Sequence, residues 1–230
     1  METFVHVWPI KWNSENMDEC LKWMEWLSEE EKNKAERFVR QSDRYQYIVA
    51  HGFCRLILSR YVKQQPHEIQ YGQEQKHKPI VVLKPDSPTV HFNLSHAGKV
   101  AVVAVSNRPV GIDVEWMDAS LVRVEMVEQF MSEQEKSTFF RLPTSQQKEA
   151  FYRCWTRKEA YVKALGEGLF YPIRKITVPL GRQPVRSWTD DVRPDEPQKW
   201  NMEQIETPPG YMGAVVHQGQ KVVCNPLKTI

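Results

Sequence analysis

Three acidic residues are spaced so that their side chains could share a metal ion. Residues 110–116 read V-G-I-D-V-E-W after a turn signal, and the period of two in a strand puts Asp113 and Glu115 on one face. Two neighbouring carboxylates repel each other unless a positive charge lies between them, and Glu159 adds a third acid on a later aromatic helix. Carboxylate oxygens suit Mg²⁺, with Mn²⁺ as an alternative, and such an ion can also bind phosphate oxygens. The sequence therefore predicts an enzyme that uses a divalent cation on a phosphate-containing substrate.

Each acid also has an ordinary structural explanation. A strand with solvent on one side would place Asp113 and Glu115 on its exposed face. Glu159 and Lys163 lie four residues apart on one helix face, so they could simply form an ion pair. A glycine directly before the acids favours an interior strand, because glycine permits the close approach of a ligand or of backbone.

The composition is typical of a folded globular protein without a strong charge. Hydrophobic residues make up 41% of the chain and charged residues 26%. Lys and Arg number 31 against 29 Asp and Glu, and a net charge of +2 argues against a nucleic-acid binder. The sequence has no signal pattern and no apolar run of about 20 residues that could span a bilayer. We therefore expect a cytoplasmic protein without a membrane partner.

Other common kinds of site are not indicated. The sequence contains no H-E-x-x-H, no Cys/His cluster and no G-x-x-x-x-G-K-[ST], so zinc and P-loop chemistry fit poorly. The four cysteines form no C-x-x-C pair and are too sparse for a disulfide scaffold, which predicts reduced thiols.

Several segments recur in order along the chain. Residues 27–32 read L-S-E-E-E-K and residues 131–136, 104 positions later, read M-S-E-Q-E-K; each has the Ser-x-x-Glu capping box of a helix start. An amphipathic helix follows in each case, and the later one is predicted to end at Gly166. A strand follows later still, at residues 98–105 and at residues 210–216.

These repeats predict an α+β fold made of two similar halves. The first half would be residues 1–107 and the second residues 108–230, with a cleft between the two copies. The alternative is a single irregular α+β domain.

Three segments, taken together and in order, resemble the signature motifs of one enzyme family. They are residues 91–96 (H-F-N-L-S-H), 110–115 (V-G-I-D-V-E) and 155–163 (W-T-R-K-E-A-Y-V-K). They match F-N-x-S-H, G-I-D-x-E and W-x-x-K-E-x-x-x-K, so the chain resembles the Sfp-type 4′-phosphopantetheinyl transferases (the Gsp/Sfp/HetI/AcpT superfamily) over residues 27–168. The resemblance implies two α+β halves in a pseudo-twofold arrangement, with the active site in the cleft between them.

The activity that the resemblance implies agrees with the three acids. Such enzymes transfer the phosphopantetheine arm of coenzyme A to a serine of an apo acyl or peptidyl carrier protein and release 3′,5′-ADP. Asp113, Glu115 and Glu159 would hold Mg²⁺ on the pyrophosphate of coenzyme A, where the ion neutralises charge. The nucleophile belongs to the carrier. Glu159 is the first candidate for the base that accepts its proton and Glu135 the second, and Lys163 completes the implied catalytic residues.

The resemblance also implies contacts to coenzyme A. Ser95 and His96 would touch its 3′-phosphate and adenosine, Lys78 would lie beside the nucleotide, and Lys34 and Lys163 would lie near the phosphates. The full set of implied binding residues is Lys34, Lys78, Asn93, Ser95, His96, Lys158 and Lys163.

The chain departs from the family pattern at a few positions. Ala97 follows the Ser-His pair where serine is common, and Glu31 stands where some relatives have lysine. Gln46 aligns with a phosphate-binding arginine of relatives, so Arg44 or Arg40 would have to replace it. These departures concern coenzyme A binding and leave the metal-binding acids unchanged.

A partner surface is expected next to the acids. Residues 116–131 contain many apolar side chains, among them Met117 and Leu121. We expect part of this segment to be an exposed platform for the serine-bearing helix of the carrier, since methionine-rich patches adapt to several partners. The alternative is a helix that packs into the core.

Two other functions are compatible with the same residues. A Mg²⁺-dependent phosphohydrolase would use water in place of the carrier serine, and a non-catalytic coenzyme A or carrier-binding protein would keep the fold without turnover. By resemblance we expect a monomer that serves nonribosomal peptide or polyketide biosynthesis.

Overall fold

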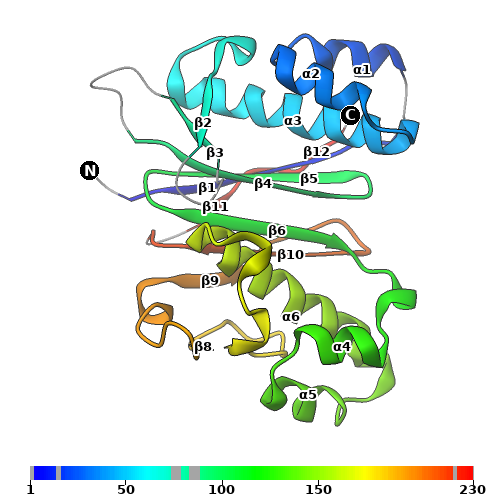
Figure 1. The fold of residues 1–230 in the computed structure, drawn as a ribbon, viewed down its shortest axis with the longest axis vertical. Coiled ribbons are helices and arrows are strands. Elements are labelled where there is room, and N and C mark those ends of the chain that lie inside the picture. The colour runs from blue at the N-terminus through cyan, green and yellow to red at the C-terminus, as the bar shows by residue number, and fades with distance from the viewer. Residues whose placement is uncertain (1–2, 14–16, 74–78, 83–88, 220–221, 230) are drawn as a thin grey trace.

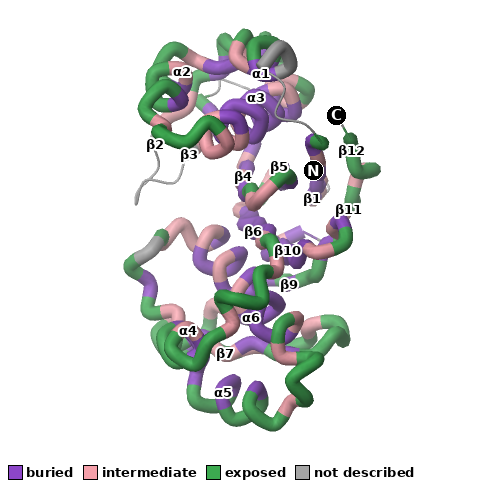
Figure 2. Tube along the Cα trace, turned by 90° about the vertical axis from the view of Figure 1, so that its right-hand side faces the viewer, coloured by how far each residue is buried: buried purple, intermediate pink, exposed green. Residues whose placement is uncertain are grey.

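Two sheets lie in the middle of the molecule, between two groups of helices (Figure 1). The computed structural model describes residues 3–13, 17–73, 79–82, 89–219 and 222–229. In the tube view the buried residues run from one helical group through both sheets to the other (Figure 2).

The first half consists of helices that cover one face of a sheet. Its elements are β1 (Val5–Lys11), α1 (Met17–Met24), α2 (Glu29–Glu36), α3 (Gln41–Val62), the pair β2 (Tyr71–Gln73) and β3 (Pro79–Val81), β4 (His91–Ala97) and β5 (Val100–Ser106). Strand β5 is apolar from Val100 to Val105 because both of its faces are buried. Ala101 and Val103 face the core beneath α3, whereas Val100 and Val102 face the second half.

The second half places a long helix on a smaller sheet. Its elements are β6 (Val110–Trp116), α4 (Val124–Phe130), α5 (Glu133–Phe139), α6 (Thr144–Leu165), the pair β7 (Ile176–Thr177) and β8 (Thr189–Asp190), β9 (Asn201–Gln204) and β10 (Tyr211–His217). Helix α6 ends at Gly166, whose φ of 72° is the left-handed conformation that favours glycine. The predicted end of this helix is therefore confirmed.

The two halves share one plan. Three strands follow the order β1-β5-β4 in the first sheet and β6-β10-β9 in the second. Helices α3 and α6 are each 22 residues long, and α2 and α5 each begin with a capping box, at Ser28 and at Ser132. The prediction of two similar α+β halves is confirmed, and the alternative of one irregular domain is wrong.

The two sheets pack on each other through a separate apolar cluster. Val110, Ile112 and Val114 of β6 lie in this cluster with Val100 and Val102 of β5. Because side chains alternate along a strand, the acids of β6 point the other way, toward α6. Packing of the two halves therefore fixes which side of β6 presents its carboxylates.

The last strands of the chain return to the first half. Strand β11 (Val222–Cys224) and strand β12 (Lys228–Thr229) both pair in parallel with β1. The backbone amide of Asn225, between them, donates to the carbonyl of Val7 over 2.8 Å. The second half as predicted, residues 108–230, therefore ends in a segment that belongs to the first sheet.

Removing residues 222–230 is expected to lower the free energy of unfolding by roughly 2–3 kcal/mol, since several hydrogen bonds of about 1 kcal/mol each are lost. The truncation also leaves β1 as an unpaired edge, which favours aggregation. Urea unfolding followed by tryptophan fluorescence measures the change, and removal of only residues 228–230 is the smaller control. An unchanged unfolding midpoint in the longer truncation would contradict this role of the tail.

Candidate active site

Gly111 lies where α6 crosses β6, and it lets the two backbones touch. A Cβ atom at this position would lie 2.1 Å from the carbonyl oxygen of Ala160 and 2.3 Å from the amide nitrogen of Ala164. The predicted close approach at this glycine is thus one of backbone to backbone. It brings Glu159 and Lys163 of α6 over the acids of β6.

Asp113 is the most buried of the three acids, with 2% of its surface exposed. Its Oδ1 accepts hydrogen bonds from Lys163 Nζ over 2.6 Å and from Ser95 Oγ over 2.9 Å. Its Oδ2 is buried and has no hydrogen-bond partner. Burial rules out a solvent-facing carboxylate here. In the part of the chain that the structure describes, Lys163 forms its ion pair with Asp113.

The other two acids are affected by the charge of Asp113. Burial, followed by the neighbouring charge of Asp113, raises the pKa of Glu115 to about 7, although Lys163 and a hydrogen bond from Trp155 act in the opposite direction. Burial and then Asp113 also raise the pKa of Glu159. Asp113 is therefore close enough to disfavour the ionised forms of Glu115 and Glu159.

These residues fit a divalent cation by charge and by donor type. The orphaned Oδ2 of Asp113 and the raised pKa values of Glu115 and Glu159 both indicate negative charge that Lys163 alone does not balance. Oxygen donors of this kind are those that Mg²⁺ prefers. Within the described ranges, no three His, Cys, Asp or Glu side chains are already arranged as a metal-binding group.

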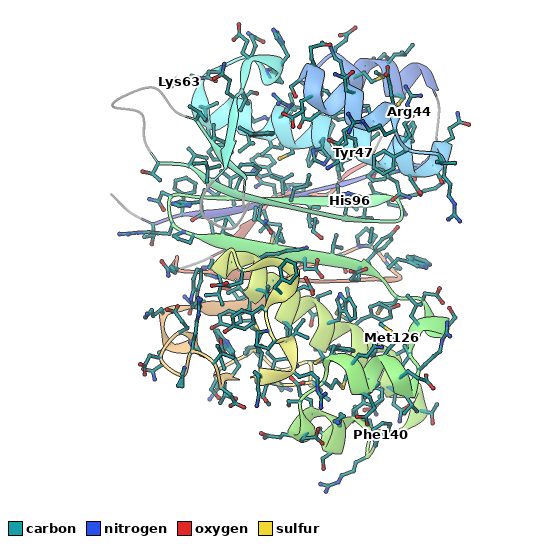
Figure 3. All side chains as sticks on the ribbon, viewed as in Figure 1. Arg44, Tyr47, Lys63, His96, Met126 and Phe140 are labelled. Carbon is teal, nitrogen blue, oxygen red and sulfur yellow. The ribbon has the colours of Figure 1, made fainter. Side chains whose placement is uncertain are left out.

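Basic and aromatic side chains of the first half gather around His51, which lies near His96. Desolvation, followed by the positive charges of His51 and Lys163, lowers the pKa of His96, which places His96 near groups from both halves. The ring of His51 stacks on Tyr47 with centroids 4.0 Å apart, and Lys34 Nζ lies 5.3 Å from the centroid of the Tyr47 ring. In Figure 3 the labelled Tyr47 lies on the helical side of the first sheet, above His96 at the end of β4.

His51 was missed at the level of sequence. It lies on α3, outside the three motifs, and a single histidine on a long helix gives no signal of its own. Lys78 was predicted to contact the nucleotide and lies outside the described residues.

Two predicted site residues are buried elsewhere, as a pair. Glu135 and Lys158 are 2% and 0% exposed, and Lys158 Nζ lies 2.6 Å from Glu135 Oε2. The carboxylate of Glu135 also accepts from the backbone amides of Ser132 and Val178, each over 2.7 Å. The ammonium of Lys158 donates to the carbonyl of Phe130 over 2.9 Å. This burial argues against Glu135 as a base and Lys158 as a coenzyme A contact, and both roles stay predictions.

The first half contains the matching arrangement. Glu31, in the capping box of α2, pairs with the buried Arg55 of α3. Each half thus uses the carboxylate of its capping box to hold a buried cation of its long helix. This duplication gives Glu135 a structural role.

Asn93 and Ser95 also have partners that the sequence did not predict. The Oδ1 atom of Asn93 accepts from the backbone amide of Ile112 over 2.8 Å, and Ser95 Oγ accepts from the amide of Val114 over 3.2 Å. Ser95 Oγ also accepts from Lys163 and donates to Asp113, which uses its one donor and both acceptor positions. The hydroxyl of Ser95 is thus engaged within the protein, and its contact with coenzyme A stays a prediction.

Residues 116–131 do not form one continuous helix. A short 3₁₀ turn at Ala119–Leu121 is followed by α4. Leu121 and Val124 are 44% and 58% exposed, whereas Val127 and Phe130 are buried in the second-half core. Part of this segment is therefore exposed and part packs into the core, and its role as a carrier platform stays a prediction.

A cleft between the halves stays a prediction. Of the cavities that the structure shows, one of about 820 Å³ is lined by Ser132, Arg174 and Thr177 among others. Another, of about 650 Å³, lies beside Met117 and Tyr211. Neither is lined by the acids.

No helix of the described residues is long and apolar enough to cross a membrane.

Comparison with known proteins covers both halves. The model of the 4′-phosphopantetheinyl transferase superfamily matches residues 109–216, and that of the N-terminal region of 4′-phosphopantetheinyl transferases matches residues 10–108. The 4′-phosphopantetheinyl transferase Sfp of Bacillus subtilis (strain 168) is 28% identical over 87% of this chain and 86% of its own length. A further 4′-phosphopantetheinyl transferase of Bacillus subtilis is 30% identical over 67% of this chain and 66% of its own. The 4′-phosphopantetheinyl transferase HetI of Nostoc sp. is 33% identical over 62% of this chain and 61% of its own.

The boundary between the two family models, at residues 108 and 109, falls just before β6, where the duplicated plan of the fold begins again. With the duplicated fold, the acids at the junction and these matches in agreement, the chain belongs to the Sfp-type 4′-phosphopantetheinyl transferases.

Proposed function

We propose that this chain transfers the 4′-phosphopantetheine group of coenzyme A to a serine of an apo acyl or peptidyl carrier protein and releases 3′,5′-ADP. The observation that supports this best is the buried carboxylate of Asp113, paired on one oxygen and free on the other, beside two acids of raised pKa. The names of the relatives agree with this activity.

In this proposal Asp113, Glu115 and Glu159 hold Mg²⁺, and Mn²⁺ could replace it. When bound, the ion supplies positive charge that stabilises the pyrophosphate of coenzyme A as its bond is broken. Lys163 and Ser95 hold Oδ1 of Asp113, so its Oδ2 is the oxygen left to take a ligand.

Glu159 is the group that accepts the serine proton. It lies on α6 beside Asp113, and without a bound cation its pKa is raised by burial and then by Asp113. The serine oxygen forms a bond to the phosphorus that bears pantetheine, and the bond from that phosphorus to the bridging oxygen breaks. The bridging oxygen leaves with 3′,5′-ADP. Glu135 has no part in this scheme, because it is buried with Lys158.

The first half, residues 1–107, contributes the nucleotide side of the site, and the second half contributes the acids. Lys34 and His96 are the proposed contacts of the first half with the phosphates and the nucleotide, and Lys163 reaches the same junction from the second half. Gln46 aligns with a phosphate-binding arginine of relatives, and we propose that Arg44 of α3 makes this contact instead. In Figure 3 Arg44 lies on the helical side of the first sheet, above the level of His96.

Mass spectrometry of an apo carrier protein, incubated with this protein, coenzyme A and Mg²⁺, tests the function. We expect the carrier to gain the mass of one phosphopantetheine and to lose this gain when EDTA is present. No gain with any of several acyl and peptidyl carriers would overturn the proposal. Release of pantetheine phosphate without a carrier would indicate a phosphohydrolase, and tight coenzyme A binding without turnover would indicate a binding protein.

We further propose that the carrier docks on exposed apolar residues at the end of β6 and just beyond it. Trp116, the last residue of β6, is 50% exposed, and Leu121 and Val124, which follow the strand, are 44% and 58% exposed. Met117, by contrast, packs partly against the second-half core, so its replacement would also affect stability. Leu121 and Val124 are thus the cleaner probes of this surface.

Replacing Leu121 and Val124 together with alanine is expected to raise the KM for carrier protein about tenfold, an effect of about 1.4 kcal/mol, and to leave the KM for coenzyme A unchanged. Steady-state kinetics with each substrate varied in turn measures this. Val192→Ala is the matched control, because Val192 is also exposed, at 48%, on the second half. Equal increases in both KM values would argue against a carrier-specific surface.

A further inference from the structure

The strand that bears the acids is the outer strand of its sheet. Strand β6 pairs with β10 on one side only, and its other edge lies against β4 of the first sheet. Ile112 and Val114 are nevertheless buried, with 0% and 1% of their surfaces exposed. Buried backbone amides require hydrogen-bond acceptors, so the amides on this edge of β6 must find theirs outside its own sheet.

Side chains of β4 supply these acceptors at a regular spacing. Asn93 Oδ1 accepts from the amide of Ile112 over 2.8 Å, and two residues on, Ser95 Oγ accepts from the amide of Val114 over 3.2 Å. The steps from residue 93 to 95 and from residue 112 to 114 are equal and run in the same direction. The two halves are therefore joined here by a parallel ladder of side chain to backbone, in place of the backbone ladder of an ordinary sheet.

Successive side chains of β4 point to opposite faces of the strand, so β4 contacts both halves. Phe92 and Leu94 pack into the core under α3, so the side chains of Asn93 and Ser95 point to the opposite face, toward β6. Apolar side chains at these two positions would leave the buried amides of Ile112 and Val114 without acceptors.

We propose that Asn93 and Ser95 are positioning residues, whose side chains fix the register of β6 against β4 and so hold the Asp113 carboxylate in place between the two halves. Asp113 lies between the two amides that are held, and Ser95 also contacts its Oδ1. A slip of β6 along β4 would move Asp113 away from Ser95, which donates to its Oδ1 from the first half. This role in catalysis rests on the proposed function, whereas the ladder itself can be tested without it.

Hydrogen exchange of single amides, followed by NMR, tests the ladder. In Asn93→Ala we expect the Ile112 amide to exchange at least about tenfold faster, while the amides of β6 that face β10 keep their rates. In Asn93→Asp the carboxylate still offers an oxygen, so protection of Ile112 should return. Ser95→Ala should have the corresponding effect on the Val114 amide. Unchanged exchange of Ile112 in a folded Asn93→Ala protein would overturn the proposal.

Kinetics separates positioning from direct contact with coenzyme A. A positioning role predicts that Asn93→Ala lowers kcat about tenfold, changes the KM for coenzyme A by less than about threefold, and is rescued by Asn93→Asp. A direct contact predicts a higher KM for coenzyme A in Asn93→Ala and a still higher one in Asn93→Asp, because the added negative charge repels phosphate. That second outcome would overturn the proposal.

Asn201→Ala is the matched control. Asn201 lies on β9, and its side-chain amide donates to the backbone carbonyl of Gly219. The substitution therefore removes a different hydrogen bond between an asparagine side chain and the backbone. We expect it to leave kcat and the exchange of Ile112 unchanged. If the wild-type protein transfers nothing to any carrier, the proposed function fails, and the exchange experiment still decides whether the ladder exists.

Discussion

Replacing Gly111 with alanine is expected to lower the transferase activity by at least about a hundredfold and to cost about 3 kcal/mol of stability. The added Cβ would lie 2.1 Å from the carbonyl oxygen of Ala160 and 2.3 Å from the amide nitrogen of Ala164. Both are backbone atoms, so the clash cannot be relieved by turning a side chain. Helix α6 must move away from β6, and Glu159 and Lys163 move with it, away from Asp113.

Gly181→Ala is the matched control for this experiment. Gly181 is also in the second half, and a Cβ atom there would have no neighbour within 4 Å. Thermal unfolding and the carrier assay should distinguish the two variants clearly. A Gly111→Ala protein with the activity and melting temperature of the wild type would show that α6 does not lie on β6 as described.

Asp113→Asn is expected to lower kcat/KM by about a thousandfold or more, an effect of roughly 4 kcal/mol, while the fold is retained. The amide has the shape of the carboxylate, and its oxygen can still accept from Ser95 and Lys163. What is lost is the negative charge, which balances Lys163 and which the proposed cation requires. Steady-state kinetics at several Mg²⁺ concentrations, with circular dichroism as a check of the fold, measures the effect.

Asp195→Asn makes the same chemical change at an exposed position of the second half and should leave kcat/KM unchanged. An Asp113→Asn variant that retains most of its activity would show that the charge of Asp113 is not needed. The three acids would then have to be reconsidered as a structural group.

Much of the fold could be predicted from the sequence because local patterns were repeated. The capping boxes at Ser28 and Ser132 mark the same helix in both halves. Period two in β6 separates the acids from Ile112 and Val114, which pack between the sheets. The tail could not be predicted, because the parallel pairing of β11 with β1 joins segments more than 200 residues apart and leaves no local pattern.

The candidate site could be predicted where residue type alone limits the chemistry. Asp113, Glu115 and Glu159 were found in this way, and the structure brings their charges together. Residues whose type has several uses were harder to assign. The capping box of α5 already engages the carboxylate of Glu135, and the sequence pattern contained this information, but the burial of Lys158 beside it depends on tertiary packing.

The partners of Asn93 and Ser95 could not be predicted from the sequence either. Their motif identified them as important, and the resemblance suggested contacts with a ligand. Their partners on β6 lie 19 residues further along the chain, in a different sheet. No periodicity within β4 can indicate which strand edge will lie beneath it.

The return of the tail to β1 has a consequence for how the protein is made. β1 emerges from the ribosome more than 200 residues before its outer neighbours, β11 and β12. Domains generally fold in the order of their synthesis, but here the first sheet cannot be completed until the whole of the second half has been translated. The first sheet thus begins before the second and is finished after it, and a nascent chain that stalls within the second half would keep the outer edge of β1 unpaired.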